Sequence, residues 1–264
     1  MTPTPGDANS EMWRKVLTGG EPAAGRVFHF LRRLPSNPRC QSCNAPFEGL
    51  GAPVMRAMGR GRSRKNPRYC TYCEKTLLEY QGGAEIELTM LFVDVRGSTT
   101  IAEKMNPTDF SRLMNHFYES AIDVLIHADA AIDKLVGDEV TALFFPGFAG
   151  QEHARRAIDA AQELLRATGY KDRNGPWIPI GVGVHTGIAW VGAIGGADGK
   201  VDFTALGDNV NTTARLASRS ASGEILVTEA ACLAAHMDVA VLERRELELK
   251  GKNETVNVRV MHVN

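Results

Sequence analysis

Two aspartates stand where buried strands are expected to end. In MLFVDVRGSTT, residues 90–100, an apolar run leads into Asp94, and Asp138 follows the Val136–Gly137 turn of a second predicted strand pair. Mg²⁺ prefers oxygen ligands and takes one or two protein carboxylates together with substrate phosphates. The GSTT stretch after Asp94 begins a helix, whose unpaired N–H groups attract an anion. Together these features predict a site for a metal-bound polyphosphate, although either aspartate alone could equally be a turn residue.

Three more polar residues could complete such a site. Lys134 precedes Asp138 by four residues, and a lysine beside an apolar strand is otherwise a solvated edge residue. Asn211 and Arg215 lie at positions i and i+4 of a predicted helix, so they share one face. Arginine suits phosphate and asparagine suits a sugar oxygen. The same pair could also be the polar stripe of an amphipathic helix.

Four cysteines form a second group with the spacing of metal ligands. They occur as CQSC (Cys40, Cys43) and CTYC (Cys70, Cys73). In a reducing compartment two C-x-x-C pairs indicate a metal site before they indicate disulfides. The spacing suits a tetrahedral structural Zn²⁺, with an iron–sulfur cluster or redox thiols as alternatives. Cys232 stands alone and is expected to be a core thiol.

The segment between the cysteine pairs, residues 49–69, is strongly basic. It contains no Asp or Glu, and its cationic residues are Arg56, Arg60, Arg62, Arg64, Lys65 and Arg68. Its glycines and prolines argue against regular structure. The basic loop 56–68 could contact nucleic acid, anionic lipid or an acidic partner, but a solvated or docked loop is favoured.

The overall composition is that of an ordinary soluble protein. Hydrophobic residues make up 44% and charged residues 23%, and the formal net charge is −1. This balance gives no argument for nucleic-acid or membrane binding. No apolar run reaches the ~20 residues of a membrane span, and the N-terminus lacks the order of a signal peptide. A cytoplasmic location is therefore expected.

The elements that must position these residues change character near residue 84. Residues 1–38 predict a helical segment with frayed first residues and a stop at Pro35, and residues 39–83 predict the cysteine module and a linker helix. Residues 84–264 follow the order β α β β α β(β) α β α β β, with a last hairpin turning near Gly251–Asn253. This order predicts an α+β sandwich of the ferredoxin-like kind, with helices on one face of a sheet.

Three blocks resemble the signatures of class III nucleotidyl cyclases in order and spacing. They are FVDVRGST, KLVGDEV and ALGDNVNTTARL, and the resemblance covers about residues 85–264. It implies that Asp94 and Asp138 hold two Mg²⁺ or Mn²⁺ ions, which activate the ribose 3′-hydroxyl and bind the triphosphate. It also implies that the backbone of Val95 contacts both the metals and the phosphates. The other residues implied to bind the phosphates are Gly97, Ser98 and Thr99.

The resemblance also implies how the nucleotide is read. Lys134 matches the lysine that reads the adenine ring, Asn211 matches the asparagine that orients the ribose, and Arg215 matches the arginine that stabilises charge as pyrophosphate leaves. Thr204 stands where many adenylate cyclases of the class have aspartate, and it resembles the threonine-bearing (class IIIb-like) subgroup, which includes bicarbonate-responsive enzymes. Guanylate cyclases typically carry glutamate and cysteine at the Lys134 and Thr204 positions, so the pair favours ATP.

The predicted function is an adenylate cyclase that converts ATP to 3′,5′-cyclic AMP and pyrophosphate. The family implies a head-to-tail homodimer, because one protomer supplies the aspartates and the other supplies the remaining polar residues. Bicarbonate or a protein is the hypothetical regulator, and the cysteine module is expected to be regulatory or dimerising. The alternatives are a non-catalytic nucleotide-binding regulator and a guanylate or dual-specificity cyclase. A diguanylate cyclase is disfavoured because Val136 replaces the first glycine of its GGDEF signature. His185 is expected to be a strand or interface residue rather than a base.

Overall fold

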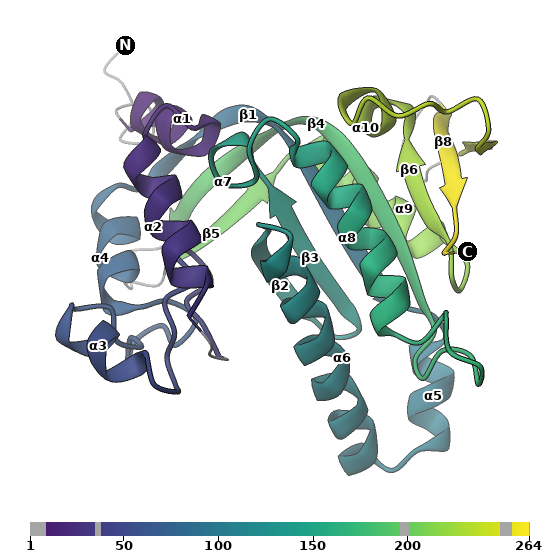
Figure 1. Cartoon of the computed structure of the whole chain (residues 1–264), viewed down its shortest axis with the longest axis horizontal. Helices are drawn as coiled ribbons and strands as arrows, with labels where there is room; N and C mark the ends of the chain where they lie inside the picture. Colours follow the sequence, from purple (N-terminus) through teal and green to yellow (C-terminus); the bar gives the residue numbers. More distant parts are fainter. Residues whose placement is uncertain (1–8, 35–37, 196–200, 249–254, 264) are drawn as a thin grey trace. The chain divides into compact units, whose positions relative to one another are not determined.

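The computed structural model describes residues 9–34, 38–195, 201–248 and 255–263 (Figure 1). The expected fraying of the first residues falls mostly outside this range, as do Pro35 and the turn near Gly251–Asn253. The described chain divides into two compact units. Unit 1 comprises Met1–Ile86, Phe145–Gly150 and Ile188–Gly207, and unit 2 comprises Glu87–Phe144, Gln151–Gly187 and Asp208–Asn264. The three predicted domains stay a prediction, because these units group segments from both sides of residue 84.

Unit 2 is built on a mixed sheet with the strand order β2-β3-β1-β4-β6-β8-β7. The strands are β1 (Gly82–Val95), β2 (Ala131–Val136), β3 (Glu139–Phe144), β4 (Ile180–Gly195), β6 (Ile225–Thr228), β7 (Glu243–Leu247) and β8 (Val256–Met261). β1 pairs with β3 in antiparallel fashion, and β4 pairs with β6 in parallel fashion. Residues 88–93 of β1 are buried without alternation, as expected for a central strand covered on both faces.

The helices of unit 2 carry their apolar residues at helical spacing. They are α5 (Ser98–Lys104), α6 (Pro107–His127), α8 (His153–Ala167), α9 (Asp208–Arg219) and α10 (Glu229–Ala234). α6 begins where the Asn106 side chain accepts a hydrogen bond from the backbone N–H of Asp109 and where Pro107 occupies the first turn. Its buried residues Met114, Phe117 and Ala121 lie on one face.

Helices cover both faces of the unit 2 sheet, so the prediction that they lie on one face is wrong. Thr186 of β4 faces α8, because its hydroxyl bonds that of Thr89, which in turn bonds His153. Successive side chains of a strand point to opposite faces. Gly183 faces α9, and a Cβ built on it would lie 2.5 Å from the backbone nitrogen of Ala217. Gly181, on the same face, meets Ser220. The glycines leave room for the second helix layer.

The burial of His153 predicts that the protein becomes less stable as the pH falls. Burial lowers the pKa of His153, and the charges of Glu87 and Glu152 oppose that change. Because the unfolded chain binds the proton more readily, His153 supports the fold fully above its unfolded pKa of about 6.5, and this support decreases as the pH falls toward the lowered folded pKa.

Urea unfolding from pH 7.5 to 5.5 tests this. The wild-type midpoint should fall with pH, and the fall should be smaller in His153→Gln. The exposed His116 provides the matched control, because His116→Gln should keep the wild-type slope. Equal slopes in His153→Gln and the wild type would contradict the assignment, whatever the absolute stability of the variant.

Unit 1 joins the N-terminal segments to part of the later chain. Its elements are α1 (Ser10–Thr18), α2 (Pro22–Arg32), α3 (Ala52–Ala57), α4 (Thr71–Glu79), α7 (Pro146–Ala149) and β5 (Val201–Leu206), which pairs antiparallel with the second half of β4. The Trp13 ring of α1 stacks on Phe203 of β5 with centroids 5.7 Å apart. The Phe28 ring of α2 stacks on Phe148 of α7 at 4.5 Å. Aromatic packing therefore holds the first helices to α7 and β5.

α3 corrects one sequence-based expectation. Residues 49–69 were expected to lack regular structure, but Ala52–Ala57 form a helix. Pro53 lies in its first turn, where a missing N–H costs no helical hydrogen bond. Ala52 and Met55 are buried, so tertiary packing stabilises a helix that is too short to be stable alone.

Candidate active site and cysteine cluster

The strand pair β1–β3 brings the segments of the two predicted metal ligands together. Asp94 lies opposite Glu139 in the register, and the backbone N–H of Val95 donates to the Asp138 carbonyl at 3.1 Å. Asp138 follows Gly137, which adopts φ 63°, a left-handed conformation that glycine tolerates best. The Tyr118 hydroxyl of α6 donates to the Gly137 carbonyl. The hairpin that carries Asp138 is therefore held both by the sheet and by α6.

Each carboxylate already has a polar partner. The Ser98 hydroxyl donates to Asp138 Oδ2 at 2.5 Å, and Asp94 forms an ion pair with Arg96. The side chain of Asp94 is only 19% exposed. Burial, and then the charge of Asp138, raise the pKa of the neighbouring Glu139. Several acidic groups thus share a partly dehydrated corner, which favours binding of a divalent cation.

Arg96 is a site residue to which the sequence assigned no role. Its guanidinium pairs with Asp94 and also donates to the Ser218 carbonyl, beside the end of α9, at 2.8 Å. Its backbone N–H donates to the Pro179 carbonyl at 2.8 Å. Burial lowers the pKa of Arg96, against the charges of Asp138 and Glu139. Arg96 therefore connects the end of β1 to the end of α9, and a metal ion would share Asp94 with it.

The predicted phosphate-binding residues lie at the β1–α5 junction. Gly97 caps α5 with φ 67°, and a Cβ built on it would meet nothing within 4 Å. The requirement for glycine is therefore conformational rather than steric. Ser98 and Thr99 form the first turn of α5 and directly follow the Asp94–Val95 segment.

α9 carries Asn211 and Arg215 on its polar side. Asn211 is exposed and Arg215 half-buried, whereas Thr212 and Thr213 between them are buried. Within the described residues, Arg215 Nη1 is a buried nitrogen without a hydrogen-bond partner. A buried unpaired guanidinium nitrogen is costly, and an anionic ligand would compensate it.

His185 is engaged by structural partners, in agreement with the role expected for it. Its Nδ1 lies 2.9 Å from Thr228 Oγ1, and its Nε2 lies 2.9 Å from Asn209 Oδ1. The ring thus links the start of α9 to β4 and to the end of β6.

The two predicted base-reading residues lie in different units. Lys134 is half-buried on β2, where the β2–β3 register shifts between Ile132 and Lys134. Its backbone N–H donates to Thr141 Oγ1 at 2.9 Å. Thr204 belongs to β5 of unit 1, is 1% exposed, and donates weakly to the Ala205 carbonyl at 3.4 Å.

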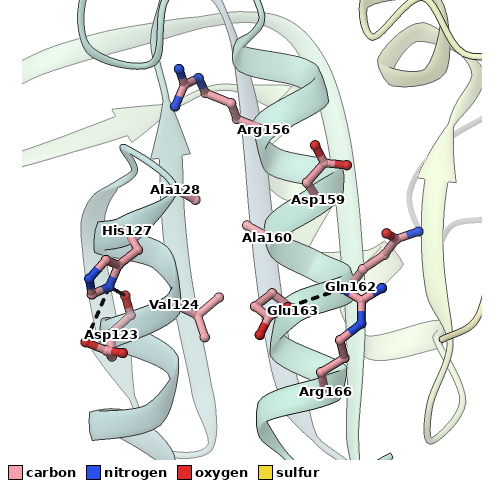
Figure 2. Close-up of a pocket in the computed structure, with 10 residues that line it drawn as sticks. All are labelled: Asp123, Val124, His127, Ala128, Arg156, Asp159, Ala160, Gln162, Glu163 and Arg166. Carbon is pink, nitrogen blue, oxygen red and sulfur yellow. Dashed lines mark hydrogen bonds and ion pairs between the residues drawn. The ribbon is translucent and has the colours of Figure 1, made fainter. Parts of the chain in front are cut away.

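A surface groove in unit 2 contains none of these residues. It has a volume of about 630 Å³ and lies between α6 and α8 (Figure 2). Its charged residues pair with one another or with neighbours, as Glu163 does with Arg166 and Asp129 with Arg156. The groove is therefore separate from the candidate active site.

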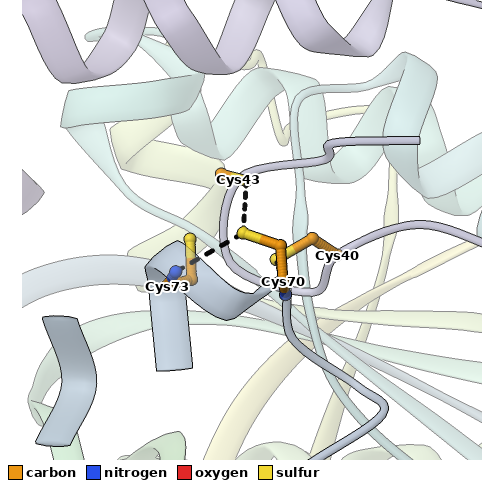
Figure 3. A group of neighbouring side chains, drawn as sticks. All are labelled: Cys40, Cys43, Cys70 and Cys73. Carbon is orange, nitrogen blue, oxygen red and sulfur yellow. Dashed lines mark hydrogen bonds between the residues drawn. The ribbon is translucent and has the colours of Figure 1, made fainter. Parts of the chain in front are cut away.

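The four cysteines of unit 1 converge as predicted (Figure 3). Their sulfur atoms all lie within 4.8 Å of one another, and Cys43 Sγ lies 3.8 Å from Cys70 Sγ. Tetrahedral Zn²⁺ with Zn–S bonds of about 2.3 Å requires sulfur separations of about 3.8 Å. All four thiols are free, so the cluster can bind a metal ion. Cys232 is also free and buried, as expected of a core thiol.

Burial and mutual hydrogen bonding shift the pKa values of the four thiols in opposite directions. Burial raises the pKa of Cys40, whereas hydrogen bonding with Cys40 lowers the pKa values of Cys43 and Cys70. Burial alone would lower the pKa of Arg60, but the charges of Cys43 and its neighbours raise it. The Arg60 guanidinium also lies 4.3 Å from the centre of the Tyr72 ring. Arg60 therefore balances part of the thiolate charge.

Comparison with known proteins identifies the chain's family. Residues 83–262 match the adenylate and guanylate cyclase catalytic domain. The chain belongs to this family. An adenylate cyclase of Anabaena cylindrica is 27% identical over 69% of this chain and 38% of that protein. An adenylate cyclase of Rhizobium meliloti is 32% identical over 49% of this chain and 20% of that protein. The chain thus spans well under half the length of these curated relatives.

Solved cyclase structures share the fold. The guanylyl cyclase Cya2 is 28% identical with a TM-score of 0.62, covering 69% of this chain and 95% of that one. The adenylyl cyclase CyaB of P. aeruginosa is 27% identical with a TM-score of 0.58, covering 69% of this chain and 97% of that one. The predicted class III membership and α+β cyclase fold are confirmed, and the threonine subgroup stays a prediction. Among the described helices, none is both long and apolar enough to cross a membrane.

Proposed function

We propose that this nucleotidyl cyclase is an adenylate cyclase, which converts ATP to 3′,5′-cyclic AMP and pyrophosphate. The observation that carries the proposal is the meeting of Asp94 and Asp138 segments across β1 and β3, next to the Ser98 helix start. A carboxylate pair beside unpaired N–H groups suits a metal–triphosphate.

Asp94 and Asp138 would hold two Mg²⁺ or Mn²⁺ ions, with Val95 contributing its backbone. The oxygen donors fit hard cations, and the partly buried corner would strengthen their binding. When bound, such ions lower the pKa of the ribose 3′-hydroxyl and neutralise the triphosphate. The chain's own part is to hold the carboxylates in place, which Ser98 and Arg96 do through their contacts.

Arg215 and Asn211 would act on the nucleotide from α9. The buried Nη1 of Arg215 lacks a partner within the described chain, so a phosphate oxygen would complete its hydrogen bonding. An arginine there stabilises the charge that develops as pyrophosphate departs. Asn211, one turn earlier, would orient the ribose.

We infer that the catalytic sites are shared by two copies of the chain. One protomer would contribute Asp94 and Asp138, and the other would contribute Lys134, Thr204, Asn211 and Arg215 in a head-to-tail dimer. The basis for this is the family resemblance together with the presence of both half-sets in one chain.

Base selection provides the direct test of the proposed substrate. Lys134 would donate to adenine N1 and the Thr204 hydroxyl would accept from the 6-amino group. With Mg²⁺ or Mn²⁺, kcat/KM for ATP should exceed that for GTP by on the order of 10- to 100-fold, because a site built for one hydrogen-bonding pattern leaves polar groups unpaired with the other.

The double variant Lys134→Glu, Thr204→Cys should reverse this preference. Chromatographic measurement of cyclic AMP and cyclic GMP reports both rates in one reaction. Lys104→Glu, an exposed change at the end of α5, is the charge-matched control. A wild-type preference for GTP would favour the guanylate cyclase alternative, and nucleotide binding without turnover would favour the non-catalytic regulator.

The four cysteines would hold a structural Zn²⁺. Four soft thiolates with mutual separations within 4.8 Å suit zinc, and an iron–sulfur cluster is the second candidate. Metal analysis with an absorption spectrum separates them, because zinc is colourless and an iron–sulfur cluster absorbs visible light.

A further inference from the structure

The open edge of β5 is held by the turn that leads into the second cysteine pair. β5 pairs with β4 on one side, and in an antiparallel pair alternate residues turn their N–H and C=O groups away from the partner. The outward N–H of Phe203 donates to the Tyr69 hydroxyl at 3.0 Å. The outward carbonyl of Val201 accepts from Asn66 Nδ2 at 2.8 Å. Side chains of the turn thus replace a missing neighbouring strand.

Tyr69 is the central member of this contact. Its hydroxyl also donates to Asp202 Oδ1 at 2.8 Å, and the residue is 1% exposed. The hydroxyl thus serves two partners, since it donates to the Asp202 carboxylate and accepts from the Phe203 backbone. Arg68 pairs with Asp202 at 3.3 Å, but its side chain is 46% exposed, and such a pair contributes little.

The turn is itself built on the cysteine cluster. The backbone N–H of Tyr69 donates to the Asn66 carbonyl at 3.0 Å, and that of Gln41, beside the first cysteine pair, donates to the Arg68 carbonyl at 3.0 Å. Cys70 follows Tyr69 directly. A metal ion that fixes the four sulfur atoms therefore also fixes the position of the Tyr69 hydroxyl.

Thr204 lies next in the chain to the clamped residues. The ring of Phe203 is held by Trp13, with centroids 5.7 Å apart, and by the edge of Phe145 at 6.0 Å. The Phe203 backbone is held by Tyr69. With both the side chain and the backbone of its neighbour fixed, Thr204 has little freedom to shift along or across β5.

We propose that Tyr69 is a positioning residue for base selection, which fixes Thr204 through Phe203 and Asp202 and so makes the ATP preference depend on metal at the four cysteines. This inference rests on the proposed role of Thr204 as a reader of adenine. It assigns the cysteine module a direct part in substrate choice rather than stability alone.

The first test follows the clamp itself in the full metal-loaded chain. Amide hydrogen exchange at Phe203 should become about tenfold faster in Tyr69→Phe, because one protecting hydrogen bond is lost. Tyr80→Phe, which changes a tyrosine that is 44% exposed at the end of α4, should leave this exchange unchanged. Removal of the metal with a chelator should accelerate exchange at Phe203 in the wild type. Unchanged exchange in both Tyr69→Phe and the chelated chain would overturn the proposal.

The second test follows substrate choice. The ratio of kcat/KM for ATP to that for GTP should fall about tenfold in Tyr69→Phe, mainly through a higher KM for ATP, and should stay at the wild-type value in Tyr80→Phe. Asp202→Ala, which removes the acceptor of the Tyr69 hydroxyl and leaves Tyr69 intact, should move the ratio in the same direction. Adding Tyr69→Phe to Thr204→Ala should produce no further change, since both act on one contact.

The outcomes distinguish the positioning role of Tyr69 from the adenine-reading role of Thr204. If Thr204→Ala lowers the ratio but Tyr69→Phe and Asp202→Ala do not, the positioning role is wrong and the proposed reading of adenine stands. If Thr204→Ala leaves the ratio unchanged, the proposed role of Thr204 fails and the inference fails with it.

Discussion

Mixing an Asp94→Ala chain with an Arg215→Ala chain should restore about a quarter of the wild-type cyclase activity. If a dimer shares its sites, random pairing makes about half of the dimers mixed, and each mixed dimer has one intact site out of two. The intact site takes its aspartates from one chain and its arginine from the other. The second site of the mixed dimer carries both changes and stays inactive.

Each variant alone should lose nearly all activity. Asp94→Ala removes the proposed metal ligand at the end of β1, and Arg215→Ala removes the cation proposed to stabilise the departing phosphates. Such changes typically cost about 10²- to 10³-fold in turnover. Asp159→Ala and Arg166→Ala, which alter exposed residues of α8, are the matched controls and should remain active separately and mixed. Light scattering checks that all four variants form dimers. If the mixed pair dimerises without recovery, each site is complete within one chain.

Replacing Cys70 by serine should abolish metal binding and unfold the cysteine module. A structural zinc in a small module contributes about 10–16 kcal/mol of binding free energy, which is largely folding free energy. The Cys70 sulfur also accepts the backbone N–H of Cys73 at 3.4 Å as the N-cap of α4. A serine hydroxyl can take over this cap, so the expected unfolding comes from loss of the metal. Metal content per chain should fall from one to zero, and proteolysis should cleave first within residues 39–79.

Cys232→Ser is the control for this change, because Cys232 is buried in unit 2, far in sequence from the cluster. It should weaken packing but leave the metal content at one per chain. A Cys70→Ser chain that keeps its metal and resists proteolysis would show that the cysteines do not form one site.

The sequence was sufficient for features that depend on local pattern. A buried strand that ends in Asp94 and a hairpin that presents Asp138 predicted that the two segments meet, and the register of β1 and β3 places them side by side. The spacing of two C-x-x-C pairs predicted convergence of the sulfur atoms, which the cluster confirms. In both cases the chemistry lies within a few residues of a recognisable element boundary.

Features that depend on tertiary contacts were not predictable in this way. Tyr69 and Asp202 are 133 positions apart, and neither residue type predicts a contact with the other. Arg96 lies two positions from Asp94, but only the packed end of α9 determines that its guanidinium turns back to that carboxylate. α3 depends on burial of Met55, and the glycine-rich sequence around this residue does not predict a buried helix. The placement of α9 did have a signal, since glycines alternate at 181 and 183 along β4.

That glycine pair determines how exactly α9 is positioned on the sheet. Most helices rest on a layer of side chains, which can change rotamer and let the helix shift or roll by a few tenths of an ångström. α9 rests at Gly183 on bare main chain, where a Cβ would lie 2.5 Å from the Ala217 nitrogen. Main chain within a sheet does not repack. α9, which bears Asn211 and Arg215, therefore packs on a surface that cannot rearrange by rotamer changes. The positions of these two polar residues are thus fixed by the backbone of the sheet.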